Sequence, residues 1–262
     1  MPLLEVSNLK TWFPVHGGLF RRLTGHIKAV DGVSFTVEPG QTVGLVGESG
    51  SGKTTVGRTI LKLIPATSGR VVFDGREILP LSEKDFRPFR REMQMIFQDP
   101  FSSINPKLSI GTAISEAAGV RGVKRDLQGR AKELLGMVGL PESILKQYPH
   151  QLSGGQRQRV AIARSLAAEP EILVADEPVS SLDMSVQAQI MNLFFDLKKK
   201  LGLSYIIISH DLNLLAVACD NIMVMKSGKA VEYGPARAII KNPQNEYTKK
   251  LIDAIPRINE KN

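Results

Sequence analysis

The sequence of 262 residues contains a single cysteine, Cys219. One cysteine excludes a disulfide within the chain and a cysteine-ligated iron–sulfur cluster. Long apolar runs are missing too, and nothing approaches the about 20 consecutive apolar residues that a membrane-spanning helix needs. The N-terminus lacks a basic segment followed by an apolar one, so we expect no signal peptide. These absences together predict a cytosolic protein.

Aromatic residues are scarce, at 6% of the sequence, whereas basic residues are in excess and give a formal net charge of +8. Such an excess leaves binding to nucleic acid or to an anionic membrane surface open. Only Phe20 and Phe89 lie beside the basic clusters, however, which is too few for a platform that stacks bases. We therefore favour solvated helix faces as the explanation of the charge.

The remaining composition is that of an ordinary soluble globular protein, with 42% hydrophobic and 23% charged residues. The length suits one large domain, or one domain with an inserted subdomain.

The strongest motif lies at residues 43–55, VGLVGESGSGKTT. Residues 43–46 predict a buried strand, a glycine-rich loop follows, and a helix begins at Lys53. This is the G-x-x-x-x-G-K-T phosphate-binding loop, in the strand–loop–helix context that it requires. The glycines let consecutive backbone N–H groups turn toward one anion, and the start of the helix adds unpaired N–H groups and the positive end of its dipole.

Each polar residue of this loop has a predicted role toward a triphosphate. Lys53 would reach the β- and γ-phosphates, the Thr54 hydroxyl would face Mg²⁺, and Thr55 could contact the α-phosphate. An aromatic residue before the loop would either stack on adenine or pack in the core. The predicted ATP-binding residues are Trp12, Phe13, Gly47, Glu48, Ser49, Gly50, Ser51, Gly52, Lys53, Thr54 and Thr55.

Strands alternate with helices in much of the chain, which predicts a mostly parallel sheet. Further buried strands are expected at residues 93–97, 171–176 and 205–209. Ligands of such sheets bind beyond the carboxyl ends of the strands. Polar or glycine residues lie at four such ends: Gly47, Gln98, Asp176–Glu177 and His210.

Other segments depart from this alternation. Strands at residues 3–6 and 33–37 and a hairpin around Asp74–Gly75 favour antiparallel pairing near the N-terminus, with residues 15–28 as a loop. Residues 108–165 have a helical period and predict a helical subdomain inserted into the α/β core. The C-terminal part predicts a hairpin at Ser227–Gly228 and closing helices at residues 235–240 and 246–255.

A second anion site is predicted at residues 152–156, LSGGQ, where a turn leads directly into a helix. A chain that binds one ATP does not need two such sites, so we infer that this one serves a nucleotide held by another chain. A simple serine-capped helix start would explain Ser153 but not the run Gly154-Gly155-Gln156.

Six motifs, in order and over nearly the whole length, resemble those of the ATP-binding subunits of ABC transporters. They are Walker A at 47–54, the Q-loop at Gln98, the signature Leu152-Ser153-Gly154-Gly155-Gln156, Walker B at 172–176 with Glu177, the D-loop Ser180-Ser181-Leu182-Asp183, and the switch His210. The resemblance implies a single α/β domain over residues 1–262, a P-loop NTPase core with a mostly parallel sheet and an N-terminal antiparallel β subdomain. It also implies a helical subdomain inserted at about residues 99–165 and a C-terminal tail at about 235–262.

A narrower resemblance is to the oligopeptide, dipeptide and nickel importer branch. It is carried by GESGSGKTT, by the run QDPFSSINP from Gln98 to Pro106, by YPH before the signature, and by NEYTKKL in the tail, which runs on to Ile255-Pro256. Relatives often continue past this tail, and some carry a cysteine cluster there. Because this sequence ends at Asn262 with one cysteine, we expect no regulation by a cluster. Residues 15–28 are also longer than the equivalent loop in many ABC ATPases, as peptide-importer subunits tend to have them.

The resemblance implies the cofactors ATP and Mg²⁺ and a role for each motif. Thr54, Gln98 and Asp176 would hold the metal. Glu177 would act as general base or water orienter, and His210 would contact the γ-phosphate. The signature would stabilise the γ-phosphate of a partner's ATP, Ser181 and Asp183 belong to the D-loop, and family spacing favours Phe13 over Trp12 as the residue that stacks on adenine.

The function implied is an ATPase subunit on the cytoplasmic face of the membrane that energises import of di- or oligopeptides. Its partners would be a second, homologous and non-identical ATPase chain, two permease subunits and, indirectly, an extracytoplasmic solute-binding protein. Import of nickel or another small solute stays open. A DNA-repair or chromosome-structure ATPase is less favoured, because those proteins insert long heptad-repeat arms between the Walker motifs. A translation factor of the superfamily would need two such units in one chain.

Overall fold

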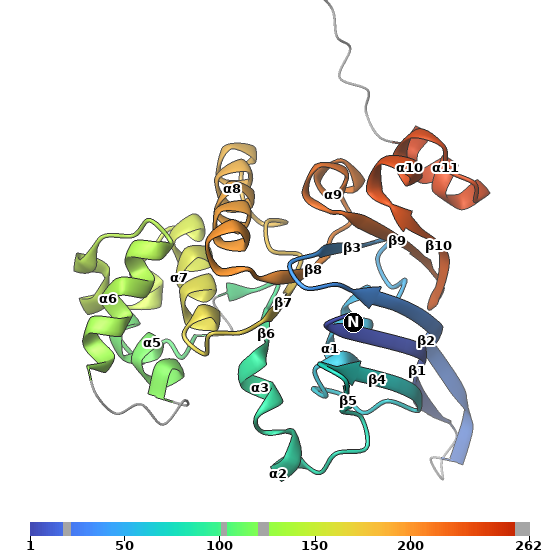
Figure 1. The fold of residues 1–262 in the computed structure, drawn as a ribbon, viewed down its shortest axis with the longest axis horizontal. Helices are drawn as coiled ribbons and strands as arrows, with labels where there is room; N and C mark the ends of the chain where they lie inside the picture. The colour runs from blue at the N-terminus through green and yellow to red at the C-terminus, as the bar shows by residue number, and fades with distance from the viewer. Residues whose placement is uncertain (18–21, 101–103, 120–125, 255–262) are drawn as a thin grey trace, which may run out of the picture. The chain divides into compact units, whose positions relative to one another are not determined.

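The computed structural model describes residues 1–17, 22–100, 104–119 and 126–254. The chain divides into two compact units, described separately below: unit 1 comprises Met1–Pro80 and Ile207–Asn262, and unit 2 comprises Leu81–Ile206 (Figure 1). Parts of two predicted motifs, residues 101–103 of the run after Gln98 and residues 255–262 of the tail, lie outside the described residues.

Unit 1 contains a four-stranded antiparallel sheet, as predicted. Its strand order is β2 (Arg22–Val37), β1 (Leu4–Gly17), β4 (Ser68–Phe73) and β5 (Arg76–Glu77). Alternate residues of β1, such as Leu4 and Val6, are buried on one face. The predicted hairpin turn at Asp74–Gly75 is confirmed, with φ values of 44° and 73° that suit a two-residue turn.

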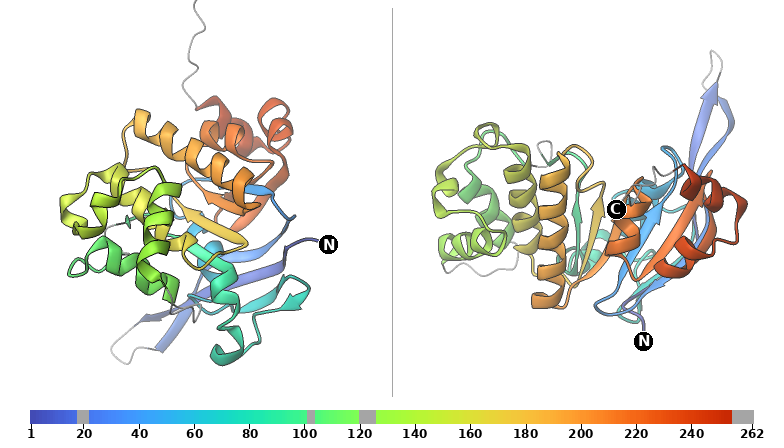
Figure 2. Two further views of the ribbon diagram at one scale, coloured as in Figure 1. Left: turned by 60° about the vertical axis from the view of Figure 1, so that its left-hand side comes forward. Right: turned by 90° about the horizontal axis from the view of Figure 1, so that it is seen from above.

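The prediction that residues 15–28 form a loop is wrong for the described part of that segment. Val15 pairs with Gly25 and His16 with Leu23, so β1 and β2 continue as a long hairpin, which Figure 2 shows extending beyond the rest of its sheet. The glycines in this segment suggested a loop. Pairing across the two strands, which includes Phe13 opposite Ile27, favours extended structure instead.

The second set of strands in unit 1 carries the phosphate-binding loop. β3 (Thr42–Val46) is fully buried and pairs in parallel with β9 (Asn221–Lys226), which forms an antiparallel hairpin with β10 (Lys229–Pro235). α1 (Lys53–Ile60) follows β3 through the loop. Lys62, two residues beyond its end, has a positive φ of 51° that does not continue a helix. α9 (Leu212–Ala218), α10 (Ala236–Lys241) and α11 (Glu246–Asp253) complete the unit.

Unit 2 contains a parallel pair of buried strands, β6 (Met93–Ile96) and β7 (Ile172–Asp176), in the register Ile96 opposite Ala175. β8 (Ser204–Ile208) crosses the boundary between the units; Ser204 donates its N–H to the carbonyl of Glu171 just before β7. Two four-residue helices that were not predicted, α2 (Glu83–Phe86) and α3 (Phe89–Glu92), precede β6.

The helical part of unit 2 agrees with the helical period of the sequence. The helices are α5 (Ile110–Gly119), α6 (Leu127–Met137), η1 (Glu142–Lys146), η2 (Pro149–Gln151), α7 (Gly154–Leu166) and α8 (Met184–Leu201). Figure 2 shows α5, α6 and α7 packed together. Leu134, Leu135 and Val138, which share one face of the helical period, are fully buried, and Gly202 ends α8 at a φ of 69°.

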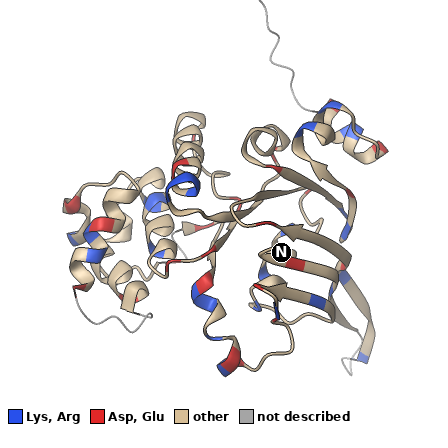
Figure 3. Ribbon diagram, viewed as in Figure 1, with Lys and Arg blue, Asp and Glu red and all other residues tan. Residues whose placement is uncertain are grey.

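No helix among the described residues combines the length and apolar character that crossing a membrane requires. Figure 3 shows Lys and Arg distributed over many elements, with acidic residues between them, rather than gathered on one element. This distribution supports the interpretation of the positive charge as solvated surface.

Candidate nucleotide-binding site

The phosphate-binding loop of unit 1 is built around the Lys53 side chain, which is only 7% exposed. Its Nζ donates to the carbonyl oxygens of Gly47 at 2.7 Å and Glu48 at 2.9 Å, and to Ser51 Oγ at 3.4 Å. The loop therefore wraps around an ammonium group at the start of α1. This arrangement places a positive charge beside the N-terminal N–H groups of the helix, where an anion is stabilised.

Two glycines of this loop have no room for a side chain. A Cβ at Gly47 would lie 2.2 Å from the carbonyl oxygen of Met225 in β9, and one at Gly52 would lie 2.1 Å from that of Ala29 in β2. Gly52 also has a φ of 102°, which L-residues rarely adopt. The loop is thus held against the two strands that flank it, which keeps its shape fixed.

His210 belongs to the same unit and follows the end of β8. Ser209, the residue before it, donates its N–H to the carbonyl of Leu45 in β3, so β8 ends beside the strand that leads into the phosphate-binding loop. The His210 side chain is exposed. Two of the four predicted strand ends, those at Gly47 and His210, are therefore neighbours.

The aromatic candidates lie in β1. Trp12 is half-buried, with Lys28 Nζ 4.5 Å and Lys10 Nζ 5.8 Å from its ring centroid. Phe13 is 39% exposed. It shares a strand face with Thr11, whose hydroxyl lies 2.9 Å from that of Thr59 in α1. Phe13 is therefore the aromatic ring that is exposed on the side of the sheet facing α1. The Trp12 ring is already in contact with the two lysine ammonium groups.

Gln98, Asp176 and Glu177 form the corresponding group in unit 2. Because β6 and β7 are parallel and adjacent, Gln98 and Asp176 leave the same edge of the sheet. Asp176 is fully buried, Glu177 is half-buried and Gln98 is exposed. Glu177 has a φ of 49°, an unfavourable conformation for a residue with a side chain and one that concentrates at functional sites.

The LSGGQ segment begins α7. Ser153 Oγ accepts from the Gln156 N–H at 3.3 Å, and Gln156 Oε1 accepts from the Ser153 N–H at 3.0 Å, so the two form a capping box. A Cβ on Gly155 would lie 2.7 Å from Val186 Cγ1. The expectation that a helix cap cannot account for this run is therefore wrong for Gln156, which the cap uses, and close packing explains Gly155. Ser153 and Gly154 remain exposed, whereas Leu152 is buried.

The D-loop leads into α8. Asp183 caps this helix by accepting from the Val186 N–H at 3.0 Å and from the Ser185 hydroxyl at 2.7 Å. These hydrogen bonds, that of Ser185 first, lower the pKa of Asp183 below its usual value. Ser181 is exposed and lies just before the cap.

Comparison with known proteins decides the family. The profile of the family described as "ABC transporter" matches residues 30–180, which is more than half of the chain. The chain belongs to the ABC transporter family. A second profile, "Oligopeptide/dipeptide transporter, C-terminal region", matches residues 231–262, so the chain is an ABC ATPase of the oligopeptide and dipeptide branch.

Two curated relatives are similar to this chain over nearly its whole length. It is 46% identical over 260 residues to the oligopeptide transport ATP-binding protein OppF of Lactococcus lactis, with 98% of this chain and 81% of the relative covered. It is also 46% identical over 257 residues to the glutathione import ATP-binding protein GsiA of Escherichia coli, with 97% of this chain covered. The chain spans only 41% of the length of GsiA.

Solved structures confirm the α/β cassette fold. The dimeric, post-hydrolysis structure of the ATP-binding cassette MJ0796 bound to ADP and Pi has a TM-score of 0.76 at 29% identity and covers 89% of this chain and 99% of its own. The structure of cbiO1 from Clostridium perfringens, part of the cbiONQ complex, has a TM-score of 0.79 at 28% identity, with 98% and 97% covered.

One contact at the ABC ATPase loop was not predicted. The hydroxyl of Tyr247 in α11 accepts from the Glu48 N–H at 3.2 Å. The tail sequence NEYTKKL was recognised as a feature of the branch, but no local pattern links positions 199 residues apart. Only the folded chain brings them together.

Proposed function

We propose that this chain binds ATP with Mg²⁺, hydrolyses it to ADP and phosphate, and thereby energises the import of di- or oligopeptides. The observation that carries the proposal is the loop closed around Lys53 Nζ, with three oxygen acceptors between 2.7 and 3.4 Å. The same ammonium group can exchange these neutral acceptors for phosphate oxygens, which bind a cation more strongly.

The remaining residues of unit 1 complete the nucleotide site. Thr54 and Thr55 lie in the first turn of α1, where their hydroxyls and N–H groups serve the phosphates and the metal. Phe13 stacks on adenine, because its ring is exposed on the face of β1 that also contacts α1. His210 contacts the γ-phosphate from the strand end beside β3.

The donor set fits Mg²⁺. The metal prefers oxygen ligands and usually keeps one or two protein ligands besides phosphate and water. Within unit 2, Asp176 offers a carboxylate fully buried at the end of β7 and Gln98 an amide oxygen at the adjacent strand end. When bound, the ion would neutralise charge that develops on the phosphates. Among the described residues, no group of three or more His, Cys, Asp and Glu side chains could hold a metal without other ligands. Phosphate and water would therefore supply the remaining ligands of the ion.

Glu177 acts on the attacking water. Glu177 directly follows the proposed metal ligand Asp176, and its backbone has the strained positive φ that concentrates at functional sites. As a general base, the Glu177 carboxylate accepts a proton from the attacking water. As an orienting group, it aligns the lone pair of that water with the γ-phosphorus.

A second chain supplies the other half of each site. The exposed Ser153 hydroxyl and the N–H groups at the start of α7 form an anion site that serves ATP held by the partner's phosphate-binding loop. The dimeric state of the similar cassette MJ0796 supports this arrangement. Two permease subunits and an extracytoplasmic binding protein complete the proposed importer, with this chain bound peripherally on the cytoplasmic face.

The cargo follows from the branch and not from the ATP site. Oligopeptides are named for OppF and the tripeptide glutathione for GsiA, so we propose a short peptide as the transported solute. Nickel is the alternative. The test is reconstitution of this chain with candidate permease subunits and an extracytoplasmic binding protein. ATP turnover should rise with di- to pentapeptides. Turnover that responds to nickel and to no peptide would contradict peptide import.

A further inference from the structure

The contact between Tyr247 and the phosphate-binding loop involves the peptide group that joins Gly47 to Glu48. The N–H of this peptide donates to Tyr247 Oη at 3.2 Å, and its carbonyl accepts from Lys53 Nζ at 2.7 Å. The N–H and C=O of a trans peptide point in opposite directions. One peptide unit is therefore held from both sides, by the tyrosine hydroxyl on one side and by the lysine ammonium on the other.

This peptide needs an external support because Gly47 precedes it. Gly47 has a φ of 152° and no Cβ, so its own sterics restrain the orientation of the following peptide weakly. If the peptide rotated, the Gly47 carbonyl would turn away from Lys53 and the Glu48 N–H would face the ammonium group instead. The positive end of the N–H dipole would then repel the lysine charge. The rotation would break the hydrogen bond from the Glu48 N–H to Tyr247 Oη together with the one from Lys53 Nζ to the Gly47 carbonyl, so the tyrosine adds to the cost of rotating the peptide.

Tyr247 is itself held in place on its ring side and at its backbone. Its side chain is 8% exposed, and Lys226 Nζ at the end of β9 lies 4.6 Å from the ring centroid. Its N–H donates to Asn245 Oδ1 at 2.9 Å, which caps α11. Burial and the Glu48 carboxylate raise the pKa of Tyr247, so the hydroxyl keeps its proton at neutral pH.

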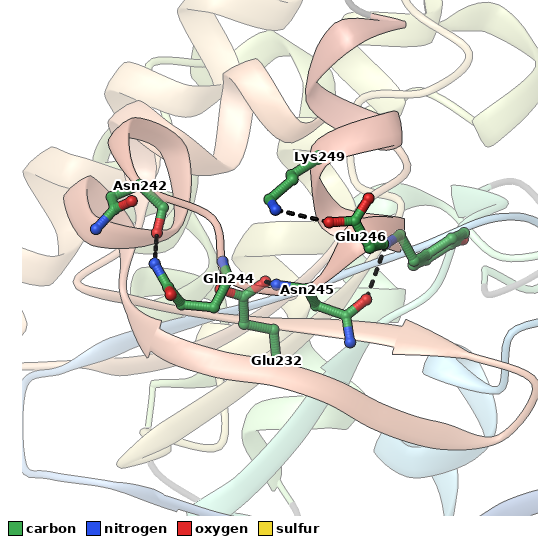
Figure 4. Close-up of polar contacts among 7 residues, drawn as sticks. Glu232, Asn242, Gln244, Asn245, Glu246 and Lys249 are labelled. Atoms are coloured by element: carbon green, nitrogen blue, oxygen red, sulfur yellow. Dashed lines mark hydrogen bonds and ion pairs between the residues drawn. The ribbon is translucent and has the colours of Figure 1, made fainter.

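The start of α11 is fixed in turn by Glu232 of β10. Its carboxylate accepts from the Gln244 N–H at 2.8 Å and from the Asn245 N–H at 3.2 Å, as Figure 4 shows beside the Gln244–Asn242 and Glu246–Lys249 contacts. A chain of hydrogen bonds thus connects β10 to the cap of α11, to Tyr247 and to the phosphate-binding loop. All of these residues belong to unit 1.

We infer that Tyr247 is a positioning residue of the nucleotide site: it fixes the Gly47–Glu48 peptide so that Lys53 is arranged for the triphosphate. The C-terminal segment from Glu232 to Asp253 is therefore part of the ATP-binding apparatus and not only a covering of the fold. The inference rests on the proposed function, because it assumes that the loop holds ATP.

The test compares Tyr247→Phe with Tyr233→Phe in the full chain. Both substitutions remove one hydroxyl from the same unit, but that of Tyr233 bonds Thr36 and Asn221, away from the loop. Loss of one hydrogen bond should speed amide exchange at Glu48 about fivefold and weaken ATP binding about fivefold in Tyr247→Phe. Tyr233→Phe should leave both unchanged. In the assembled transporter, KM for ATP should rise and kcat stay the same.

A double-mutant cycle tests the route through Glu232. Glu232→Gln should weaken ATP binding in the wild-type background and add nothing in the Tyr247→Phe background, because both act through the same hydroxyl. Wild-type exchange at Glu48 and wild-type affinity in Tyr247→Phe would overturn the inference. If the wild-type chain itself failed to bind ATP, the proposed function would fail, and the exchange measurement would still report whether the tyrosine holds the peptide.

Discussion

Individual residues at the strand ends were the most predictable part of this protein. The G-x-x-x-x-G-K-T spacing and the four strand ends could be recognised because buried strands have a strong apolar pattern and glycine or polar residues interrupt it. What the sequence could not provide is how each group is held. The positive φ of Glu177 and the loop oxygens that accept from Lys53 are geometric features that a residue pattern does not report. The Tyr247 contact joins positions 199 residues apart in the chain.

Glu177→Gln removes the proposed base while keeping size and hydrogen-bonding capacity. We expect ATP binding to persist and turnover in the assembled complex to fall by about 10²–10⁴, the usual contribution of a positioned base. Glu171→Gln, an exposed change just before the same strand, is the control and should behave as wild type. Unchanged turnover in Glu177→Gln would contradict the assignment.

Gly52→Ala tests whether the loop depends on its close contact with β2. The new Cβ would lie 2.1 Å from the Ala29 carbonyl, in addition to the cost of a φ of 102°, so we expect a lower melting temperature and ATP binding at least tenfold weaker. Gly50→Ala has a comparable φ of 80° but open space around its Cβ. It should therefore be the milder variant in a thermal melt. Equal losses in the two variants would show that backbone strain alone matters.

At the scale of the elements, the alternation of strands and helices was predictable, but short or glycine-containing elements were not. β3, β6 and β7 stand out as buried runs, and α8 has both a cap and a terminating glycine. Helices α2 and α3, of four residues each, carry too few residues for a period to emerge. The hairpin of residues 15–17 and 22–28 was missed because its stability comes from pairing across strands, which a local pattern does not report.

Ser153 has two roles that a pair of substitutions separates. Ser153→Ala removes the cap of α7 and should cost about 0.5–2 kcal/mol of stability in chemical denaturation. Ser153→Asn retains a capping side chain and should cost much less. Both variants should lower ATP turnover of the assembled complex, because neither presents the serine hydroxyl to a partner's γ-phosphate. Wild-type turnover in both would leave Ser153 as a helix cap only.

The Glu232 contact with the start of α11 has a predictable pH dependence. Burial raises the pKa of Glu232, but hydrogen bonds from the N–H groups of Gln244 and Asn245 and the charge of Lys249 outweigh it and hold the pKa below the ordinary 4.5. A carboxylate with a lowered folded-state pKa stabilises the fold above its unfolded pKa and loses this effect as the pH falls through the folded value. The melting-temperature difference between wild type and Glu232→Gln should therefore be constant above about pH 5 and shrink in more acidic buffer. A difference that grows on acidification would contradict this account.

At the scale of the whole molecule, the proposed ATP site is complete only with a second chain. The fold and the family were predictable from six motifs in order, because they are local and strictly spaced. The assembly was inferred from an excess of anion sites: one at the phosphate-binding loop and one at the start of α7. The capping box weakens part of that argument, because it explains Gln156 without a ligand. The inference of a second chain therefore depends on Ser153 and Gly154, which are exposed at the start of α7.

The most direct test is a structure of the ATP-loaded complex made with the Glu177→Gln chain, which should trap the nucleotide before hydrolysis. We predict that each ATP held by Lys53 of one chain lies within hydrogen-bond distance of the Ser153 hydroxyl position and the first N–H groups of α7 in the other ATPase chain. A structure in which this turn lies away from every ATP would contradict the account.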